Sequence, residues 1–159
     1  MACQDYEEFI AALNANEVKY LIVGAHAVAA YGRPRATKDL DVFLDHTPEN
    51  AERIVQAIRQ FFGGTDLGFR ESDFLDLQWH IQLGVAPTRI DLLAKIDGIE
   101  EFAVVWKNRN ELNFGSVPCH FISETDLIVN KKASGRAQDL ADVKALEKIR
   151  ALKAKRKTT

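Results

Sequence analysis

Residues 24–42 decide the fold and read Gly-Ala-His-Ala-Val-Ala-Ala-Tyr-Gly-Arg-Pro-Arg-Ala-Thr-Lys-Asp-Leu-Asp-Val. They follow an apolar, strand-like run and end in two alternate carboxylates, Asp39 and Asp41. Because residues i and i+2 of a strand share a face, with Cα atoms about 6.5 Å apart, we expect both carboxylates to point the same way. Beside a glycine turn and a helix start, such a pair can hold Mg²⁺ against the phosphates of a nucleotide.

The bulk composition is that of one soluble globular domain. Of the 159 residues, 47% are hydrophobic and 28% are charged, which is enough for a real core and argues against disorder. No apolar run approaches the ~20 residues of a membrane span, and the acidic start is unlike a signal peptide. We therefore expect a cytoplasmic protein without membrane contact. Cys3 and Cys119 lack metal spacing and are expected to be reduced and structural.

Charge is distributed unevenly along the chain, whose formal net charge is −2. No acidic residue follows Glu147, and the cations beyond it are Lys148, Arg150, Lys153, Lys155, Arg156 and Lys157. The acidic remainder suits a site that recruits a divalent cation. The basic end either touches RNA, DNA or a partner, or places cations at the negative end of a helix dipole. We expect a single domain over residues 1–147 and a basic helix end or tail over 148–159.

Hydrophobic periodicity predicts a mixture of helices and strands. Helices are predicted over 5–14, 25–31, 48–62, 99–107, 123–134 and 137–153. Strands are predicted over 19–23, 40–44, 77–83, 88–93 and 117–122, with a hairpin joining the third and fourth. This order favours an α/β or α+β fold in which a mixed β-sheet is flanked by helices and followed by C-terminal helices.

A third carboxylate, Asp91, lies between Ile90 and Leu92 in one of the predicted strands, where an unpartnered charge would be costly. If that strand lies beside the strand of Asp39 and Asp41, three carboxylates can grip two Mg²⁺ ions about 3.5–4 Å apart. Such ions activate an attacking hydroxyl and neutralise a triphosphate during in-line displacement. The alternative interpretation of any one of these residues is a solvent-facing or capping carboxylate.

Three motifs follow one another in the chain: Val23-Gly24-Ala25, Asp39-Leu40-Asp41 and the strand carrying Asp91. In this order they resemble the polymerase-β type nucleotidyltransferase superfamily, in particular its small bacterial branch related to the abortive-infection AbiEii toxins. The superfamily pattern is an apolar strand, Gly followed by Gly or Ser, Asp-x-Asp or Asp-x-Glu, and a later strand carboxylate. Residues 126–143 also resemble the branch's Lys…Arg-x-x-Asp-x-x-Asp stretch, so the resemblance covers about residues 19–147.

The resemblance implies a nucleotidyltransferase-like sheet and a role for each matching residue. It makes Asp39, Asp41 and Asp91 the catalytic carboxylates and the ligands of Mg²⁺ or Mn²⁺, with Asp91 helping to activate the acceptor hydroxyl. The implied nucleotide-binding residues are Gly24, Ala25, Arg35, Thr37 and Lys131. For the accessory residues Arg136, Asp139 and Asp142, a catalytic role and an ion-paired motif that fixes the last two helices both stay open.

The histidines are weaker candidates. His26, at a helix start, either touches phosphate or packs against its neighbours. His80 lies on the polar face of its predicted strand, where its side chain can face the same cleft. His46 and His120 have no partners at metal spacing.

The activity implied by the resemblance is transfer of a nucleoside monophosphate from an NTP, such as ATP, to an acceptor hydroxyl. The acceptor is a tRNA or other RNA, a protein or a small molecule, and the implied biology is a toxin-antitoxin or defence system. Ala25 stands where the pattern has Gly or Ser, and it motivates an alternative: a catalytically weak or inactive nucleotide- or partner-binding protein of the same fold. Because the chain is short, a homodimer or a partner protein is expected to complete the acceptor site.

Overall fold

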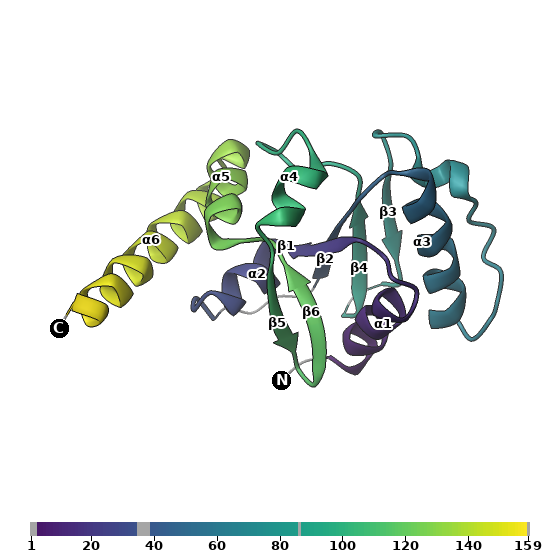
Figure 1. Cartoon of the computed structure of the whole chain (residues 1–159), viewed down its shortest axis with the longest axis horizontal. Coiled ribbons are helices and arrows are strands. Elements are labelled where there is room, and N and C mark those ends of the chain that lie inside the picture. The colour runs from purple at the N-terminus through teal and green to yellow at the C-terminus, as the bar shows by residue number, and fades with distance from the viewer. Residues whose placement is uncertain (1–2, 35–38, 86, 159) are drawn as a thin grey trace.

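A six-stranded sheet forms the centre of the fold (Figure 1). The structure is a computed structural model and describes residues 3–34, 39–85 and 87–158. The strands are β1 (Tyr20–Val23), β2 (Asp39–Leu44), β3 (His80–Leu83), β4 (Arg89–Leu93), β5 (Asn110–Phe114) and β6 (Val117–Phe121). Their order across the sheet is β3-β4-β2-β1-β6-β5. Since β2 runs antiparallel to β1 and parallel to β4, the sheet is mixed, which confirms the predicted fold class.

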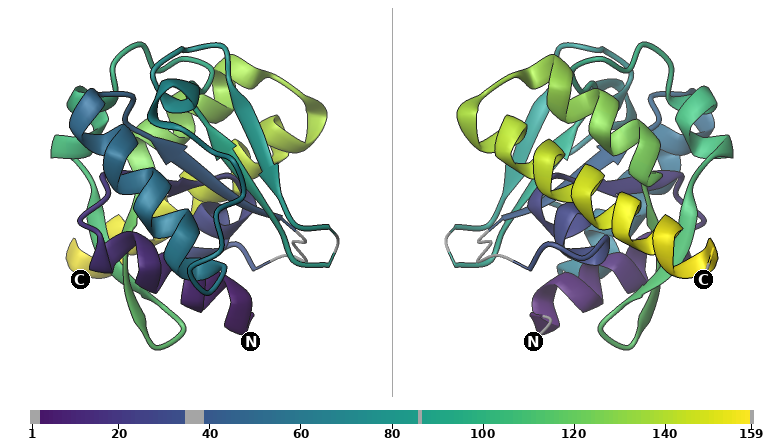
Figure 2. Two further views of the ribbon diagram at one scale, coloured as in Figure 1. Left: turned by 90° about the vertical axis from the view of Figure 1, so that its right-hand side faces the viewer. Right: turned by 90° about the vertical axis from the view of Figure 1, so that its left-hand side faces the viewer.

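Helices cover both sides of this sheet. They are α1 (Gln4–Ala15), α2 (Gly24–Ala30), α3 (Pro48–Phe61), α4 (Phe102–Lys107), α5 (Glu124–Ser134) and α6 (Ala137–Thr158), with a short 3₁₀ helix η1 (Glu71–Phe74). Figure 2 shows α1 and α3 in front when the molecule is seen from one side, and α5 and α6 in front when it is seen from the opposite side. The predicted C-terminal helices are therefore present and pack against each other.

The core lies between the sheet and α1 and α3. All four residues of β1 are buried, as its continuous apolar sequence requires of a central strand. Phe9 of α1 is fully buried, and so is Ile54 of α3, because the apolar positions of each helix repeat on one face. Thr47 caps α3 by accepting a hydrogen bond from the backbone N–H of Asn50, and Pro48 occupies its first turn.

One predicted strand has a wrong start, and one strand of the sheet was missed. The strand predicted over 77–83 begins only at His80, because Leu77 is exposed and the side chain of Asp76 accepts a hydrogen bond from the Gln78 N–H in a local turn. The strand β5 was not predicted at all. It is an edge strand whose first four residues are polar or exposed, so it carries no apolar alternation, and only its pairing with β6 reveals it.

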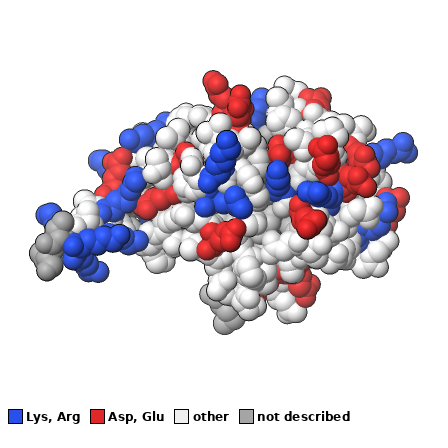
Figure 3. Space-filling model, viewed as in Figure 1, with Lys and Arg blue, Asp and Glu red and all other residues white. Residues whose placement is uncertain are grey.

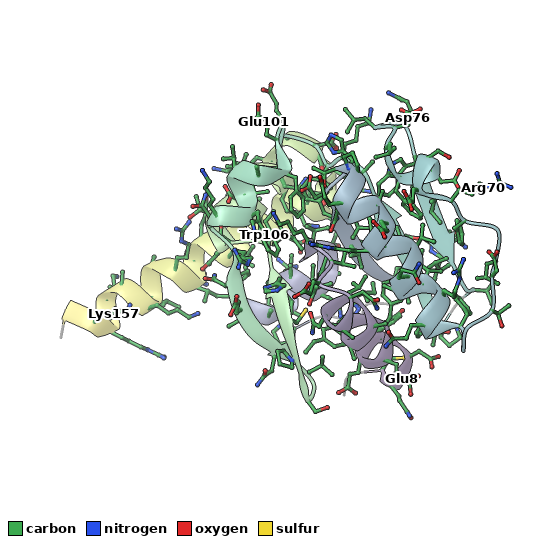
Figure 4. The ribbon with its side chains drawn as sticks, turned by 45° about the vertical axis from the view of Figure 1, so that its right-hand side comes forward. Glu8, Arg70, Asp76, Glu101, Trp106 and Lys157 are labelled. Carbon is green, nitrogen blue, oxygen red and sulfur yellow. The ribbon has the colours of Figure 1, made fainter. Side chains whose placement is uncertain are left out.

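The helix predictions differ mainly at their ends. The helix predicted from Ile99 begins at Phe102, because Ile99 pairs with Ile96 across a tight turn. The last helix continues to Thr158 instead of ending near Lys153, and its final turns are exposed and project from the body (Figure 1). Lys and Arg side chains gather at this projecting end (Figure 3), and Lys157 points away from the body (Figure 4). Within the described ranges, no helix is both long and apolar enough to cross a membrane.

Candidate active site

A cleft of about 800 Å³ opens between β2, the start of α2, the segment after β4 and the helices α5 and α6. The sequence-predicted residues that line it are Gly24, Ala25, Asp39, Asp41, Lys131, Arg136 and Asp139. Residues separated by more than 100 positions thus face one hollow. Asp91 and Asp142 lie outside the lining, and Arg35 and Thr37 fall outside the described residues, so their predicted phosphate contacts stay predictions.

The strands β2 and β4 bring the three carboxylates together. In their parallel register, Asp41 lies opposite Asp91 and Asp39 lies opposite Arg89. Directly opposed residues project from the same face, as do residues i and i+2 along one strand. Four charged side chains therefore stand at the corners of one patch. The strand of Asp91 is adjacent to that of Asp39 and Asp41, which was the condition for a shared site.

Gly24 closes one side of this patch. It has a positive φ of 68° and follows Val23, the register partner of Asp41. A Cβ atom added at position 24 would lie 3.1 Å from Asp41 Cγ and would collide with Asp41 Oδ2. Glycine is required here on two counts, since other residues rarely adopt this backbone conformation and any side chain would displace the carboxylate. The glycine of the sequence motif therefore makes room for Asp41.

The surroundings of Asp41 favour its protonated form. Burial, together with the charges of Asp91 and Asp39, raises the pKa of Asp41 from its ordinary value of 3.8 to about 6, while Lys131 and Arg89 oppose the shift. Asp91 is only 5% exposed, and its Oδ1 is buried without a hydrogen bond. A buried carboxylate oxygen in this state is costly unless a cation reaches it. Among the described residues, the patch thus holds three carboxylates and the single guanidinium of Arg89.

A divalent cation fits this donor set. Three carboxylates with one unsatisfied buried oxygen match the preference of Mg²⁺ and Mn²⁺ for hard oxygen ligands. The carboxylates are not gathered around a single point, however: among the described residues, no group of three His, Cys, Asp or Glu side chains is placed to hold a metal ion. Arg89 lies between two of them, with its Nη2 2.9 Å from Asp39 Oδ2 and 2.9 Å from Asp91 Oδ2. The predicted metal site thus stays a prediction.

The aromatic rings of Tyr6 and His26 pack near the charged patch. The Tyr6 hydroxyl of α1 donates to the backbone carbonyl of Arg89 at 3.0 Å, and burial raises the pKa of Tyr6 to about 12. The ring of His26 packs edge-on against Tyr6, with centroids 5.5 Å apart, and also contacts Phe114. Burial lowers the pKa of His26, and its buried Nε2 has no hydrogen bond. These contacts favour the packing interpretation of His26 over phosphate binding.

His80 stands at the edge of the sheet. Its Nε2 lies 3.9 Å from Asp91 Oδ1, and its side chain is 61% exposed. The two strands β3 and β4 form the predicted hairpin, which brings His80 to the same side as Asp91. The imidazole is thus within reach of the third carboxylate from the solvent side.

The helices α5 and α6 carry a second charged cluster. Lys131 Nζ lies 3.2 Å from Asp139 Oδ1 and 3.4 Å from Asp142 Oδ2, and all three side chains are buried. Arg136 Nε donates to Asp139 Oδ2 at 2.8 Å, while Arg33 Nε lies 3.5 Å from Asp142 Oδ1. Although burial opposes it, hydrogen bonds from Arg136 and Lys131 hold the pKa of Asp139 below its ordinary value.

This cluster joins the two helices across Gly135, which ends α5 in the left-handed conformation. The structure therefore contains the ion-paired motif that was one of the two interpretations of Arg136, Asp139 and Asp142. A catalytic role is left open for Arg136 and Asp139, because both also line the cleft. Asp142 is fully buried outside the lining, so its placement favours a purely structural role.

Sequence reasoning missed part of the cleft wall, namely Lys95, Asp97, Asn130, Ser134 and Gln138. Asp97 is held in place, because Asn130 donates to its backbone carbonyl at 2.8 Å and Ser134 donates to its carboxylate at 3.0 Å. Lys95 is exposed, and of the described cations in the lining it is the one for which the structure shows no ion pair. No local signal marked Lys95, because β4 ends at Leu93 and an exposed lysine after a strand is ordinary in isolation.

Comparison with protein families gives one match. A family model described as "Nucleotidyltransferase of unknown function (DUF6036)" matches residues 4–155, from α1 to the last turns of α6. No curated protein matches the chain.

Proposed function

Because the chain belongs to this family of nucleotidyltransferases of unknown function, we propose that it is a metal-dependent enzyme that transfers a nucleoside monophosphate from an NTP to an acceptor hydroxyl. Membership of the family confirms the nucleotidyltransferase resemblance, and the substrate and the metal are our proposal. The observation that carries it is the register of β2 and β4, which sets Asp39, Asp41 and Asp91 on one face beside Gly24.

The residues divide the work as follows. Asp39, Asp41 and Asp91 would hold Mg²⁺ or Mn²⁺, which when bound lowers the pKa of the acceptor hydroxyl and neutralises charge on the triphosphate. We assign to Asp91 the task of accepting the proton of the acceptor hydroxyl, because its Oδ1 has no hydrogen-bond partner among the described residues. The acceptor oxygen forms a bond to the α-phosphorus, the bond from that phosphorus to the bridging oxygen breaks, and pyrophosphate leaves.

The phosphates need further partners along the cleft. Gly24 and Ala25 line it at the start of α2, where an absent or small side chain lets a phosphate approach the backbone. Lys95 offers an unpaired ammonium group on the opposite wall. Lys131 already faces two carboxylates, so we assign it first to the α5–α6 cluster and only second to the nucleotide. Its positive charge still acts on Asp41.

The class of acceptor and the biological setting are also part of our proposal. An RNA, a protein or a small molecule can supply the hydroxyl, and an NTP substrate is consistent with a cytoplasmic reaction of the toxin-antitoxin or defence type. A homodimer or a partner protein would complete the acceptor site. The competing proposal is a binding protein of the same fold with weak or no turnover, favoured by Ala25 in the cleft wall.

The test is label transfer from each α-³²P-NTP, with Mg²⁺ or Mn²⁺ and with total tRNA and cell lysate as acceptors. We expect a labelled product with wild-type protein, and none with Asp41→Asn. Asp66→Asn, which makes the same chemical change at an exposed site, serves as the control and should retain transfer. Metal-dependent NTP binding without any transfer would contradict the proposal and favour the binding protein.

A further inference from the structure

Arg89 occupies a position that the family pattern does not explain. It lies opposite Asp39 in the register of β2 and β4, and it is two residues before Asp91 on β4. Its guanidinium therefore reaches both carboxylates at once, with Nη2 at 2.9 Å from each. A single cationic nitrogen stands between two of the three groups that would hold a metal ion.

The guanidinium is held by few of its donors. Nη2 makes the contacts with both carboxylates, while Nε is buried without a hydrogen-bond partner among the described residues. The side chain is 36% exposed, so solvent lies next to it. Its backbone, in contrast, is fixed by the sheet and by the hydroxyl of Tyr6, which donates to its carbonyl. The main chain of Arg89 is thus anchored, whereas its ion-paired side chain borders the solvent.

We propose that Arg89 is a positioning residue that acts as an internal counter-cation for the carboxylates and is displaced when a divalent cation binds. In the metal-free protein, the guanidinium neutralises Asp39 and Asp91 and keeps both side chains in place. A bound metal ion and the guanidinium compete for the same two carboxylate oxygens, one from Asp39 and one from Asp91. Arg89 therefore lowers the affinity of the site for metal. This inference rests on the proposed function, since it takes the three carboxylates as the metal ligands.

The proposal predicts that substitution of Arg89 strengthens metal binding. Removing a residue that merely braces the site weakens metal binding or leaves it unchanged, whereas removing a competing cation strengthens it. For a unit charge a few ångströms from a half-exposed site, the expected gain in metal affinity is about tenfold. The same substitution removes the counter-charge from the metal-free site, so it lowers the melting temperature in EDTA and has little effect when metal is saturating.

The experiment measures Mn²⁺ binding to the full chain by electron paramagnetic resonance, without nucleotide, for wild type, Arg89→Gln and Arg70→Gln. Arg70 is an exposed arginine that points away from the molecule (Figure 4), so its substitution controls for net charge. We expect about tenfold tighter binding for Arg89→Gln and less than a twofold change for Arg70→Gln. Thermal unfolding in EDTA and in saturating Mn²⁺ gives the second readout, and Arg89→Met replaces Arg89→Gln if the latter does not fold.

The outcomes separate this inference from the proposed function. Wild-type binding that Asp41→Asn abolishes, but that a folded Arg89 variant leaves unchanged or weakens, overturns the role of Arg89 alone. An equal decrease in the melting temperature of the Arg89 variant with and without Mn²⁺ also overturns it. A purely structural residue stabilises the metal-free and the metal-bound protein alike. Wild-type protein that binds no Mn²⁺ overturns the metal site, and the inference with it.

Discussion

Two charged clusters face the same cleft, and they are built in opposite ways. The strand cluster (Asp39, Asp41, Asp91 and Arg89) sets three carboxylates against one guanidinium and leaves a buried oxygen unsatisfied. The helix cluster, formed by Lys131, Arg136, Asp139, Asp142 and Arg33, sets two carboxylates against three cations. Among the described residues, carboxylates outnumber cations in the strand cluster, which suits it to recruit an ion. In the helix cluster cations outnumber carboxylates, and although Asp142 Oδ2 also lacks a hydrogen bond it lies 3.4 Å from Lys131 Nζ, which suits this cluster to fix two helices.

The largest effect should come from the strand cluster. Asp91→Asn keeps the shape of the side chain but removes the carboxylate to which the proposed reaction assigns the proton of the acceptor, so we expect transfer to fall on the order of a thousandfold. Initial rates of α-³²P-NMP transfer measure this, and circular dichroism checks that the fold is retained. If the variant keeps most of its activity, the strand cluster is not the catalytic centre, and the distinction between the two clusters fails.

The helix cluster should respond through stability. Asp142→Asn leaves the buried Lys131 with one carboxylate in place of two, and we expect a loss of about 2–3 kcal/mol in the free energy of unfolding. Urea denaturation gives the value, and Glu147→Gln, which touches only the exposed Lys132, is the control. At temperatures where Asp142→Asn stays folded, its transfer rate should remain within a few-fold of wild type. A large rate loss in the folded variant would place this cluster in the chemistry.

The sequence anticipated the strand cluster better than the helix cluster, and the reason is physical. Asp39 and Asp41 share a face by the geometry of any strand, and Asp91 was recognisable as a charge in an apolar run. The role of Arg89 depends on the register between β2 and β4, which joins residues 50 positions apart and leaves no local signal. The ion pairs of Lys131 likewise require the turn at Gly135 to bring the next helix back.

The same limit explains the elements that were missed. The edge strand β5 has exposed polar residues in place of an apolar alternation, so its existence depends on β6 and not on its own sequence. Lys95 was overlooked because an exposed lysine after a strand is ordinary in isolation. It becomes a candidate only when α5 and α6 are seen to form the opposite wall of the cleft.

Protonation of Asp41 affects the stability of the strand cluster. The pKa of Asp41 is raised to about 6 in the folded protein, so the folded protein binds this proton more tightly than the unfolded chain does. Its contribution to stability is therefore present below pH 4 and is lost as the pH rises through 6. We expect Asp41→Asn to be about 1–2 kcal/mol more stable than wild type at pH 7 in EDTA, and equal to it at pH 4.

Urea denaturation of both proteins at pH 4, 5, 6 and 7 measures this difference. Asp66→Asn should show no such trend, because Asp66 is an exposed residue outside the cluster. If Asp41→Asn is less stable than wild type at pH 7, the negative charge of the Asp41 carboxylate is already balanced by cations in the metal-free protein.

The smallest predicted effect concerns Lys95. Lys95→Gln removes the unpaired cation of the cleft wall, so we expect the KM for NTP to rise about three- to tenfold while kcat changes little. Lys107→Gln, at the exposed end of α4, provides the matched control. A fall in kcat at constant KM would assign Lys95 to the chemical step, and no change in either constant would remove it from the nucleotide site.

The fate of each phosphate tests the proposed reaction directly. Wild-type protein is incubated with Mn²⁺, the accepting fraction and either α-³²P-ATP or γ-³²P-ATP, with EDTA as the control. We expect the α label to join the acceptor and the γ label to leave in pyrophosphate, both only with metal and not in Asp41→Asn. Transfer of the γ label, or transfer of the α label that survives EDTA and Asp41→Asn, would contradict it.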